Sequence, residues 1–253
     1  MRARKRFGQH FLVDQGVLTA LVKRIRPQPD DKLLEIGPGH GALTEHLYGT
    51  AGRYAAVEID RDLVPFLKAR FADLEVINDD ILRVDLDGLL GTEPGGWRLV
   101  GNLPYNISTP LIVRLLEHLG HIRDMHFMLQ REVAARLAGN PGTKAWGRIA
   151  VLTQYHCRVE MVLEVPPEAF DPPPKVHSAV VRLVPRDDRP ALDDPDALDR
   201  VLRQAFSQRR KRLGNALQSL QPDWAGAGVD PGRRADDLSV AEFVALANHL
   251  PGT

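Results

Sequence analysis

The middle of the chain combines three chemical features that could hold a flat base. An amide, a stiff backbone and an aromatic ring occur in four consecutive residues: Asn102, Leu103, Pro104 and Tyr105. The apolar run 97–101 before them predicts a buried strand. Ser108-Thr109-Pro110 after them predicts a helix start with Thr109 as the cap. Ligands of α/β sheets bind at such strand-to-helix corners. The sequence favours a base-binding site here, with an ordinary proline turn as the alternative.

A glycine-rich turn predicts a second site. Gly37 and Gly39 follow the predicted strand 32–36, and the turn opens a helix as dinucleotide-binding turns do. Glu58 ends the next predicted strand, 21 residues after Gly37, where a carboxylate can accept both hydrogens of a ribose diol. Asp80 follows the third predicted strand, where a carboxylate can accept from an adenine amino group. Together these strand-end groups predict an adenosine pocket.

An adenosine pocket suits both NAD and S-adenosylmethionine. NAD requires a pyrophosphate at the helix start and a hydride-transfer partner such as a histidine–acid pair. The nine histidines show no such pair. The sulfonium cofactor requires a flat amine acceptor beside its methyl group, and residues 102–105 supply a site for one. The residues therefore favour a methyl transfer while leaving a nicotinamide dehydrogenase as an alternative.

The elements that position these residues alternate between strand and helix. Hydrophobic patterning predicts strands at 32–36, 53–59, 74–77, 97–102, 125–129, 159–165 and 178–184. Helices are predicted between them at 42–48, 62–71, 111–119, 132–137 and 149–155. This order indicates an α/β fold with a mostly parallel sheet, and the last two strands predict an antiparallel edge.

A polar linker at residues 186–190 predicts a domain boundary. Beyond it the pattern is helical, with helix-start signals at Asp194-Pro195 and at Ser239 with Glu242. We expect residues 1–185 to form the catalytic domain and residues 186–253 to form a small all-helical domain. No strand is predicted after residue 185.

Composition narrows the class of protein. The 253 residues carry 33 basic and 33 acidic side chains, so net charge points to no partner, but the basic residues cluster. Residues 1–26 hold seven Lys or Arg against one acid, and a second cluster spans residues 209–212. Such clusters can contact phosphates, with a solvated face as the alternative. One cysteine, Cys157, and the absence of an apolar leader or span predict a cytoplasmic protein without membrane association.

Six blocks carry a resemblance to a known family. They are residues 8–12, 35–39, 57–60, 102–106, 170–176 and 205–211, in this order along the chain. The sequence resembles class I S-adenosylmethionine-dependent methyltransferases, and more narrowly the family that dimethylates adenine N6 in ribosomal RNA. The resemblance implies a Rossmann-like catalytic domain and a small helical RNA-binding domain. Two departures are visible: His10 stands where relatives often have Asn, and Gly214 stands where a larger, often basic residue is expected.

The resemblance also implies roles for individual residues. Cofactor contacts are expected from the following residues: His10, Leu12, Gly37, Gly39, Glu58, Asp80 and Asn102. The catalytic group is expected to comprise the corner and one more aromatic residue: Asn102, Leu103, Pro104, Tyr105 and Phe170. RNA contacts are expected from both basic clusters: Arg4, Lys5, Arg6, Arg209, Arg210, Lys211 and Arg212.

These roles define an expected mechanism. The Asn102 side-chain oxygen and the Leu103 carbonyl would accept the N–H groups of adenine N6 and localise its lone pair. Tyr105 and Phe170, the latter held on a surface loop by the prolines after it, would stack the flipped base. In-line attack on the sulfonium methyl would then need mostly positioning.

The implied reaction is dimethylation of adjacent adenosines in a loop near the 3′ end of 16S ribosomal RNA during small-subunit biogenesis. The implied partner is the immature 30S subunit, and we expect a monomer without a metal. A 23S ribosomal RNA methyltransferase of the erythromycin-resistance type remains an alternative because it shares these blocks. A ribosome-assembly checkpoint factor with secondary catalysis remains another.

Overall fold

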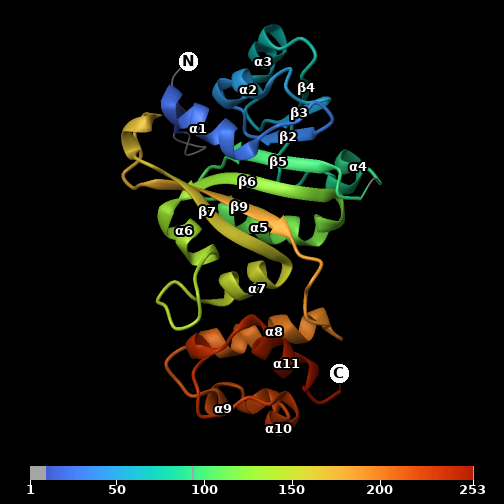
Figure 1. Ribbon diagram of the computed structural model, residues 1–253, viewed down its shortest axis with the longest axis vertical. Helices are drawn as coiled ribbons and strands as arrows, with labels where there is room; N and C mark the ends of the chain where they lie inside the picture. The colour runs from blue at the N-terminus through green and yellow to red at the C-terminus, as the bar shows by residue number, and fades with distance from the viewer. Residues whose placement is uncertain (1–9, 93, 253) are drawn as a thin grey trace. The chain divides into compact units, whose positions relative to one another are not determined.

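The computed structural model describes residues 10–92 and 94–252, and its centre is a seven-stranded sheet (Figure 1). The strands span the following residues: β2 Lys32–Ile36, β3 Arg53–Val57, β4 Glu75–Ile77, β5 Trp97–Asn102, β6 Ile122–Gln130, β7 Cys157–Val165 and β9 Ser178–Pro185. Their order is β4-β3-β2-β5-β6-β9-β7. The first five pair in parallel, and β9 pairs antiparallel with β6. The predicted α/β class with a mostly parallel sheet is confirmed.

Short helices connect the parallel strands. They are α2 (Ala42–Leu47), α3 (Val64–Arg70), α4 (Leu86–Leu90) and α5 (Ser108–Leu115), followed by a 3-10 turn at Leu116–His121. The central strand β2 is buried along almost its whole length and β5 at all but its last residue, as parallel strands covered on both faces must be. The predicted cap at Thr109 was wrong. The helix starts two residues earlier than that cap implies, at Ser108, and its N-cap residue, Ile107, makes no side-chain hydrogen bond.

The sequence analysis missed the first elements of the described chain. Helix α1 (Gln15–Ile25) is capped by Asp14, whose carboxylate accepts from the Val17 N–H at 2.8 Å. Before it, β1 (Phe11–Leu12) pairs antiparallel with β8 (Phe170–Asp171), which follows a 3-10 turn at Pro167–Ala169. This two-stranded pairing brings the N-terminal block beside a segment that is distant in sequence.

A buried ionic cluster holds the C-terminal end of α1 against the sheet. The Arg98 guanidinium donates two hydrogen bonds of 2.9 Å to Asp124 and one of 2.7 Å to Asp31. It also donates to the Ile25 carbonyl at 2.5 Å. All three charged side chains are at most 7% exposed. Because the opposite end of α1 contributes Gln15 to the cavity described below, this cluster fixes one wall of the site from a distance.

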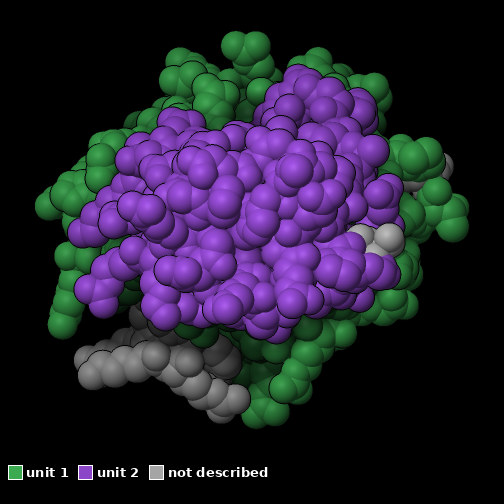
Figure 2. Space-filling view, turned by 90° about the horizontal axis from the view of Figure 1, so that it is seen from below, with its two compact units in different colours: residues 1–134, 159–185 green, residues 135–158, 186–253 purple. Residues whose placement is uncertain are grey.

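The chain forms two compact units (Figure 2). The first contains residues 1–134 and 159–185, and the second contains 135–158 and 186–253. The unit boundary after Pro185 lies where we predicted a domain boundary, but residues 135–158 group with the C-terminal segment rather than with the catalytic domain. Trp146 and Val151 are fully buried in the same apolar core as Leu198 and Phe243. That shared core explains the grouping.

The second unit is helical. Its helices are α7 (Arg148–His156), α8 (Pro195–Ser207), α9 (Leu213–Ala216), α10 (Trp224–Ala227) and α11 (Val240–Asn248), and α6 (Arg131–Leu137) spans the boundary. Asp194 caps α8 with Pro195 in its first turn, and Ser239 forms a capping box with Glu242, as predicted. Between Arg186 and Gly252 the structure has no strand. None of the described helices is long and apolar enough to cross a membrane.

Candidate active site

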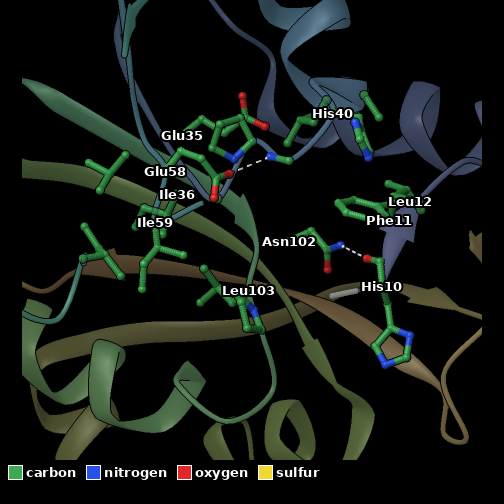
Figure 3. A pocket seen from close by; sticks show the side chains of 18 of the residues that line it. His10, Phe11, Leu12, Glu35, Ile36, His40, Glu58, Ile59, Asn102 and Leu103 are labelled. Atoms are coloured by element: carbon green, nitrogen blue, oxygen red, sulfur yellow. Dashed lines mark hydrogen bonds between the residues drawn. The ribbon is translucent and has the colours of Figure 1, made fainter. Parts of the chain in front are cut away.

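A cavity of about 1030 Å³ lies in the first unit, where β2, β3, β4 and β5 end. It is lined by all seven predicted cofactor residues: His10, Leu12, Gly37, Gly39, Glu58, Asp80 and Asn102. Four of the five predicted catalytic residues also line it, because Leu103, Pro104 and Tyr105 join Asn102. The structure therefore brings the two sites predicted from separate motifs into one cavity (Figure 3).

The glycine-rich turn after β2 adopts a backbone that requires glycine. Gly39 and Gly41 have φ values of +59° and +78°. A Cβ atom on Gly41 would lie 2.7 Å from the Phe71 ring, and one on Gly39 would lie 3.1 Å from the Phe11 ring. The turn is therefore packed closely on both sides, and its backbone forms one wall of the cavity.

Glu58 is held at the end of β3 by the backbone around it. One carboxylate oxygen accepts from the Gly39 N–H at 3.0 Å (Figure 3), and the other accepts from the Asp60 N–H at 2.8 Å. The residue is only 3% exposed, and burial raises the pKa of its carboxyl although the two N–H groups oppose the rise. Each oxygen retains a second lone pair, so the side chain can still accept two hydroxyl groups from a ligand.

Asp80 and Ile59 complete the adenosine-type part of the cavity. One Asp80 oxygen accepts from the Leu82 N–H at 2.9 Å, which fixes the side chain in the loop after β4. Ile59 follows Glu58 directly and is 46% exposed although it is large and apolar. Both residues line the cavity. Ile59 was missed, and the signal that could have found it is an apolar residue directly after a strand-end acid.

The corner formed by residues 102–105 follows β5, and the N-terminal segment orients its amide. The Asn102 Nδ2 atom donates to the His10 carbonyl at 2.9 Å, which leaves Oδ1 as the acceptor available to a ligand (Figure 3). The Leu103 N–H donates to Met128, while the Leu103 carbonyl accepts no hydrogen bond from any described residue. The Pro104 carbonyl accepts from Ile107 N–H and Ser108 Oγ, both at 3.1 Å. The corner therefore presents two acceptor oxygens on a fixed backbone.

His10 connects three parts of the site. Its carbonyl holds Asn102, its Nδ1 atom lies 2.7 Å from the Pro172 carbonyl, and its ring stacks on Tyr105 at 5.7 Å with an angle of 28°. The next residue, Phe11, contacts the His40 ring at 4.4 Å beside the glycine-rich turn. The resemblance implied that His10 contacts the cofactor. The structure shows that it also contacts Asn102, Tyr105 and Pro172.

The aromatic residues of the predicted catalytic group lie in different environments. The Tyr105 ring is half-buried in the cavity wall, its hydroxyl lies 2.8 Å from Ser178 Oγ, and burial raises its pKa. Phe170 is 3% exposed, belongs to the apolar core of the first unit and does not line the cavity. The prediction that Phe170 is held on a surface loop was wrong, because pairing of β8 with β1 turns its side chain into the core beside Leu12.

A buried carboxyl group that the sequence analysis gave no role also lines the cavity. Glu35 of β2 is 2% exposed, and one of its oxygens, Oε2, accepts from Thr44 Oγ1 at 2.6 Å and from the Tyr54 hydroxyl at 2.5 Å. Burial raises the pKa of this carboxyl to about 7, although both donors favour the ionised form. Glu35 can therefore change its charge near neutral pH.

The basic residues fall into three groups. Arg4, Lys5 and Arg6 lie outside the described residues. Residues 208–212 form a turn between α8 and α9, because α8 ends at Ser207. Within this turn Arg209 pairs with Asp236 at 2.6 Å and donates to the Thr143 and Lys144 carbonyls, so it holds a neighbouring loop of the second unit.

The other cations of the turn are exposed. They are Arg210, Lys211 and Arg212, and none forms an ion pair with a residue in the described parts of the chain. An isolated β-bridge joins Arg212 to Arg234, which is also exposed. Gly214 permits this approach, because a Cβ atom there would lie 3.2 Å from Pro231. The structure thus places a fourth exposed cation, missed in the sequence, beside the predicted cluster.

A mostly parallel sheet with an adenosine-type cavity and an amide corner at its strand ends defines the protein as a class I S-adenosylmethionine-dependent methyltransferase. The family model for ribosomal RNA adenine dimethylases matches residues 1–251, and the chain belongs to that family.

Relatives of known name agree over the full length. The chain is 52% identical to the ribosomal RNA small subunit methyltransferase A of Chromohalobacter salexigens, covering 100% of this chain and 93% of the relative. It is 52% identical to the protein of the same name from Pseudomonas aeruginosa, covering 98% and 95%.

Solved structures show the same architecture. A dimethyladenosine transferase from Plasmodium falciparum matches with a TM-score of 0.79 and 26% identity, over 94% of this chain and 96% of that chain. The 23S rRNA methyltransferase ErmE matches with a TM-score of 0.73 and 28% identity, over 95% and 99%.

Proposed function

We propose that this protein dimethylates N6 of adjacent adenosines in a loop near the 3′ end of 16S ribosomal RNA. We further propose that it acts as a monomer, without a metal, on immature 30S subunits in the cytoplasm. The observation that carries the proposal is the Asn102 amide, whose nitrogen is engaged by His10 so that its oxygen is presented in the same cavity as Glu58. The names of the relatives at about half identity, which specify the small subunit, support 16S over 23S RNA.

The residues present suit an adenosine-containing cofactor. Glu58 has lone pairs for the two ribose hydroxyls, Asp80 can accept from the adenine amine, and Ile59 offers an apolar contact for the ring. S-adenosylmethionine supplies a methyl group on a positively charged sulfur, an activated group that an amine can attack without a strong base. The part played by the chain is therefore positioning, which can supply roughly 7–11 kcal/mol of a barrier.

The acceptor oxygens of the corner prepare the amine. The exocyclic nitrogen of adenine is a poor nucleophile because its lone pair is delocalised into the ring. Asn102 Oδ1 and the Leu103 carbonyl accept one N–H each, which favours a pyramidal nitrogen with a localised lone pair. Pro104 and the hydrogen bonds to its carbonyl keep these two acceptors in place. An unpaired or flipped base is required, because these atoms cannot be reached inside a duplex.

Base stacking is assigned to Tyr105. Its ring lines the cavity and is already stacked by His10, whereas Phe170 lies in the core. Stacking of one base on an aromatic side chain contributes about 1–3 kcal/mol. His10 therefore supports the stacking ring with its own ring and orients the Asn102 amide with its main-chain carbonyl.

Phosphate contacts are assigned to the exposed cations of the second unit. Arg210, Lys211, Arg212 and Arg234 are available, while Arg209 is engaged by Asp236 and by two carbonyls. Cations of this kind position RNA without reading its sequence. The particular adenosines are therefore recognised by the fit of the base in the cavity and by the shape of the RNA.

The test is methylation of 30S subunits that lack the modification. The protein is incubated with 30S subunits, 50S subunits and a methyl-labelled cofactor, and the RNA is digested and analysed by mass spectrometry. We expect N6,N6-dimethyladenosine in 16S RNA alone. Asn102→Ala should lose the product, and Asn140→Ala, which alters an exposed asparagine of the second unit, should retain it. Label in 23S RNA, on cytosine or on ribose would exclude the proposed substrate.

A further inference from the structure

Arg114 lies outside the cofactor cavity but contacts the loop that forms one of its walls, and the mechanism above gives it no role. It is a half-buried residue of α5, and its guanidinium donates to the carbonyls of Ile81 and Val84 in the loop after β4. These two residues are buried. Within the parts of the chain that the structure describes, Arg114 forms no ion pair with a carboxylate. Its charged group therefore acts on the main chain of this loop.

The loop holds Asp80 by only one of its carboxylate oxygens. Oδ1 accepts from the Leu82 N–H at 2.9 Å. The Asp80 carbonyl accepts from the N–H groups of Arg83 and Val84 at 2.7 and 2.8 Å, so the main chain turns tightly here. Oδ2 accepts no hydrogen bond from a described residue, and residues 79–82 all line the cavity. Asp80 therefore has one oxygen fixed by the loop and one available to a ligand in the cavity.

A single peptide unit, the one between Ile81 and Leu82, connects Arg114 to Asp80. Because a trans peptide unit is planar, its C=O and N–H point in opposite directions. The C=O of this unit accepts from Arg114, and its N–H donates to Asp80 Oδ1. Rotation of the unit would break both hydrogen bonds together, so the bond to Arg114 fixes the direction of the N–H that holds the carboxylate. A charged donor on the C=O also polarises the unit, which strengthens the N–H as a donor.

A second arginine, Arg83, is the competing candidate for holding Asp80. Its Nε atom lies 3.8 Å from Asp80 Oδ2, but its side chain is 85% exposed. An exposed ion pair at this distance contributes little, because water screens the attraction and the long side chain keeps its freedom. Arg114 instead contacts two buried residues of the loop, and its second contact, with the Val84 carbonyl, lies directly before the Asp85 cap of α4. The geometry therefore favours Arg114 over Arg83 as the residue that fixes the carboxylate.

We propose that Arg114 is a positioning residue for the adenine end of the cofactor. Through the Ile81–Leu82 peptide it holds the Asp80 carboxylate where that group accepts from the 6-amino group of adenine, and it thereby sets a preference for adenine over a 6-oxo purine. A 6-oxo purine presents an oxygen in place of the amino group, so two acceptors would face each other unsatisfied. This inference rests on the proposed cofactor site. It adds that recognition of the base depends on a residue of α5 that does not line the cavity.

Calorimetry with two ligands tests the inference without turnover. S-adenosylhomocysteine carries the 6-amino group, and S-inosylhomocysteine carries an oxygen in its place. We expect wild type to bind the adenine ligand about 10- to 100-fold more tightly, as one charge-assisted hydrogen bond implies. Arg114→Met keeps an unbranched side chain but removes the donors, so the ratio of the two affinities should fall by about fivefold, the effect of a typical hydrogen bond. Arg114→Lys keeps the charge without the planar fork that reaches two carbonyls, and its ratio should be intermediate.

Arg83→Met is the matched control, because it removes the other arginine beside Asp80 by the same substitution and should keep the wild-type ratio. If Arg114 supported only the fold, Arg114→Met would lower the melting temperature and weaken both ligands by the same factor. A ratio unchanged in the Arg114 variants that fold, or lowered equally by Arg83→Met, would overturn the inference and leave the cofactor site intact. Failure of wild type to bind S-adenosylhomocysteine would instead contradict the proposed function, and equal wild-type affinity for the two ligands would contradict the adenine contact assigned to Asp80 within it.

Discussion

Glu35 makes the stability of the protein depend on pH in an unusual direction. Its carboxyl pKa is about 7 in the folded protein against 4.5 for an ordinary glutamate. Between these values the folded state binds a proton that the unfolded state does not, so the free energy of unfolding falls as pH rises through this window. Most carboxyl groups, whose pKa is lowered by folding, act in the opposite direction. The stabilisation that the Glu35 proton contributes to the folded state is complete below pH 4.5 and is lost above pH 7.

The magnitude follows from these two values. Linkage between a pKa of 4.5 and one of about 7 gives a loss of about 2.5 kcal/mol between pH 5 and pH 8. Glu35→Gln keeps an acceptor for Thr44 and Tyr54 but cannot ionise. We therefore expect the stability of wild type relative to Glu35→Gln to decrease by about 2.5 kcal/mol over this range. Urea denaturation followed by circular dichroism, in the absence of cofactor, measures the quantity at each pH.

Two histidines titrate in an overlapping pH range, and comparing wild type with Glu35→Gln cancels their contribution. Burial lowers the pKa of His126 and of His156 to about 4, so both stabilise the folded state increasingly as pH rises from 4 to 6.5. They oppose the Glu35 effect in wild type alone, but they are present in both proteins and cancel in the difference. A difference that stays constant from pH 5 to pH 8 would show that Glu35 is already ionised in the fold, and the reasoning would fail.

Four further outcomes are expected. Glu58→Gln should weaken cofactor binding in calorimetry, because charge-assisted hydrogen bonds contribute about 1.5–3 kcal/mol each; unchanged affinity would remove its role. Asn102→Ala should reduce turnover far more than RNA affinity, and near wild-type turnover would refute the assignment. Arg210→Ala should flatten the salt dependence of RNA binding by about 0.7–0.9 in log–log slope, whereas Arg209→Ala should lower the melting temperature and leave the slope unchanged. The reverse result would restore the role first expected of Arg209. Arg98→Ala should destabilise the fold by about 3–5 kcal/mol in urea denaturation, because it leaves the buried Asp124 carboxylate without its arginine and the buried Asp31 carboxylate with Arg123 as its remaining arginine; a loss below 1 kcal/mol would contradict this.

The sequence predicted the sheet and the cavity because their signals are local. The buried runs of β2 and β5, the glycine turn and the acids at the strand ends each occupy a few consecutive residues, and parallel strands end at a common edge. Once the strands are known, the meeting of Glu58, Asp80 and Asn102 follows from topology. Pairwise contacts were not needed to predict it.

What was missed depends on contacts between distant segments. The pairing of Phe11–Leu12 with Phe170–Asp171 involves two residues on each side, which is too short for a periodic pattern. It nevertheless decides that Phe170 is buried. Similarly, residues 135–158 lie in the sequence between the sheet strand β6 and most of β7 but pack with helices α8 and α11. The charge of Arg209 predicted a phosphate contact, and only the position of Asp236, 27 residues later, shows that it is engaged within the protein.

The contacts of residues 10–12 explain why an N-terminal block belongs to a site built on a sheet. Phe11 packs against the turn at Gly39, whose N–H is held by Glu58, and the His10 carbonyl holds the Asn102 amide. The cofactor side and the catalytic side of the cavity are thus joined by two consecutive residues and by backbone atoms that no side-chain substitution removes directly. A change at position 10 acts through its ring, on Tyr105 and Pro172, while the Asn102 contact persists because it is made by the main chain. A substitution of the side chain at position 10 is therefore expected to keep the orientation of the Asn102 amide.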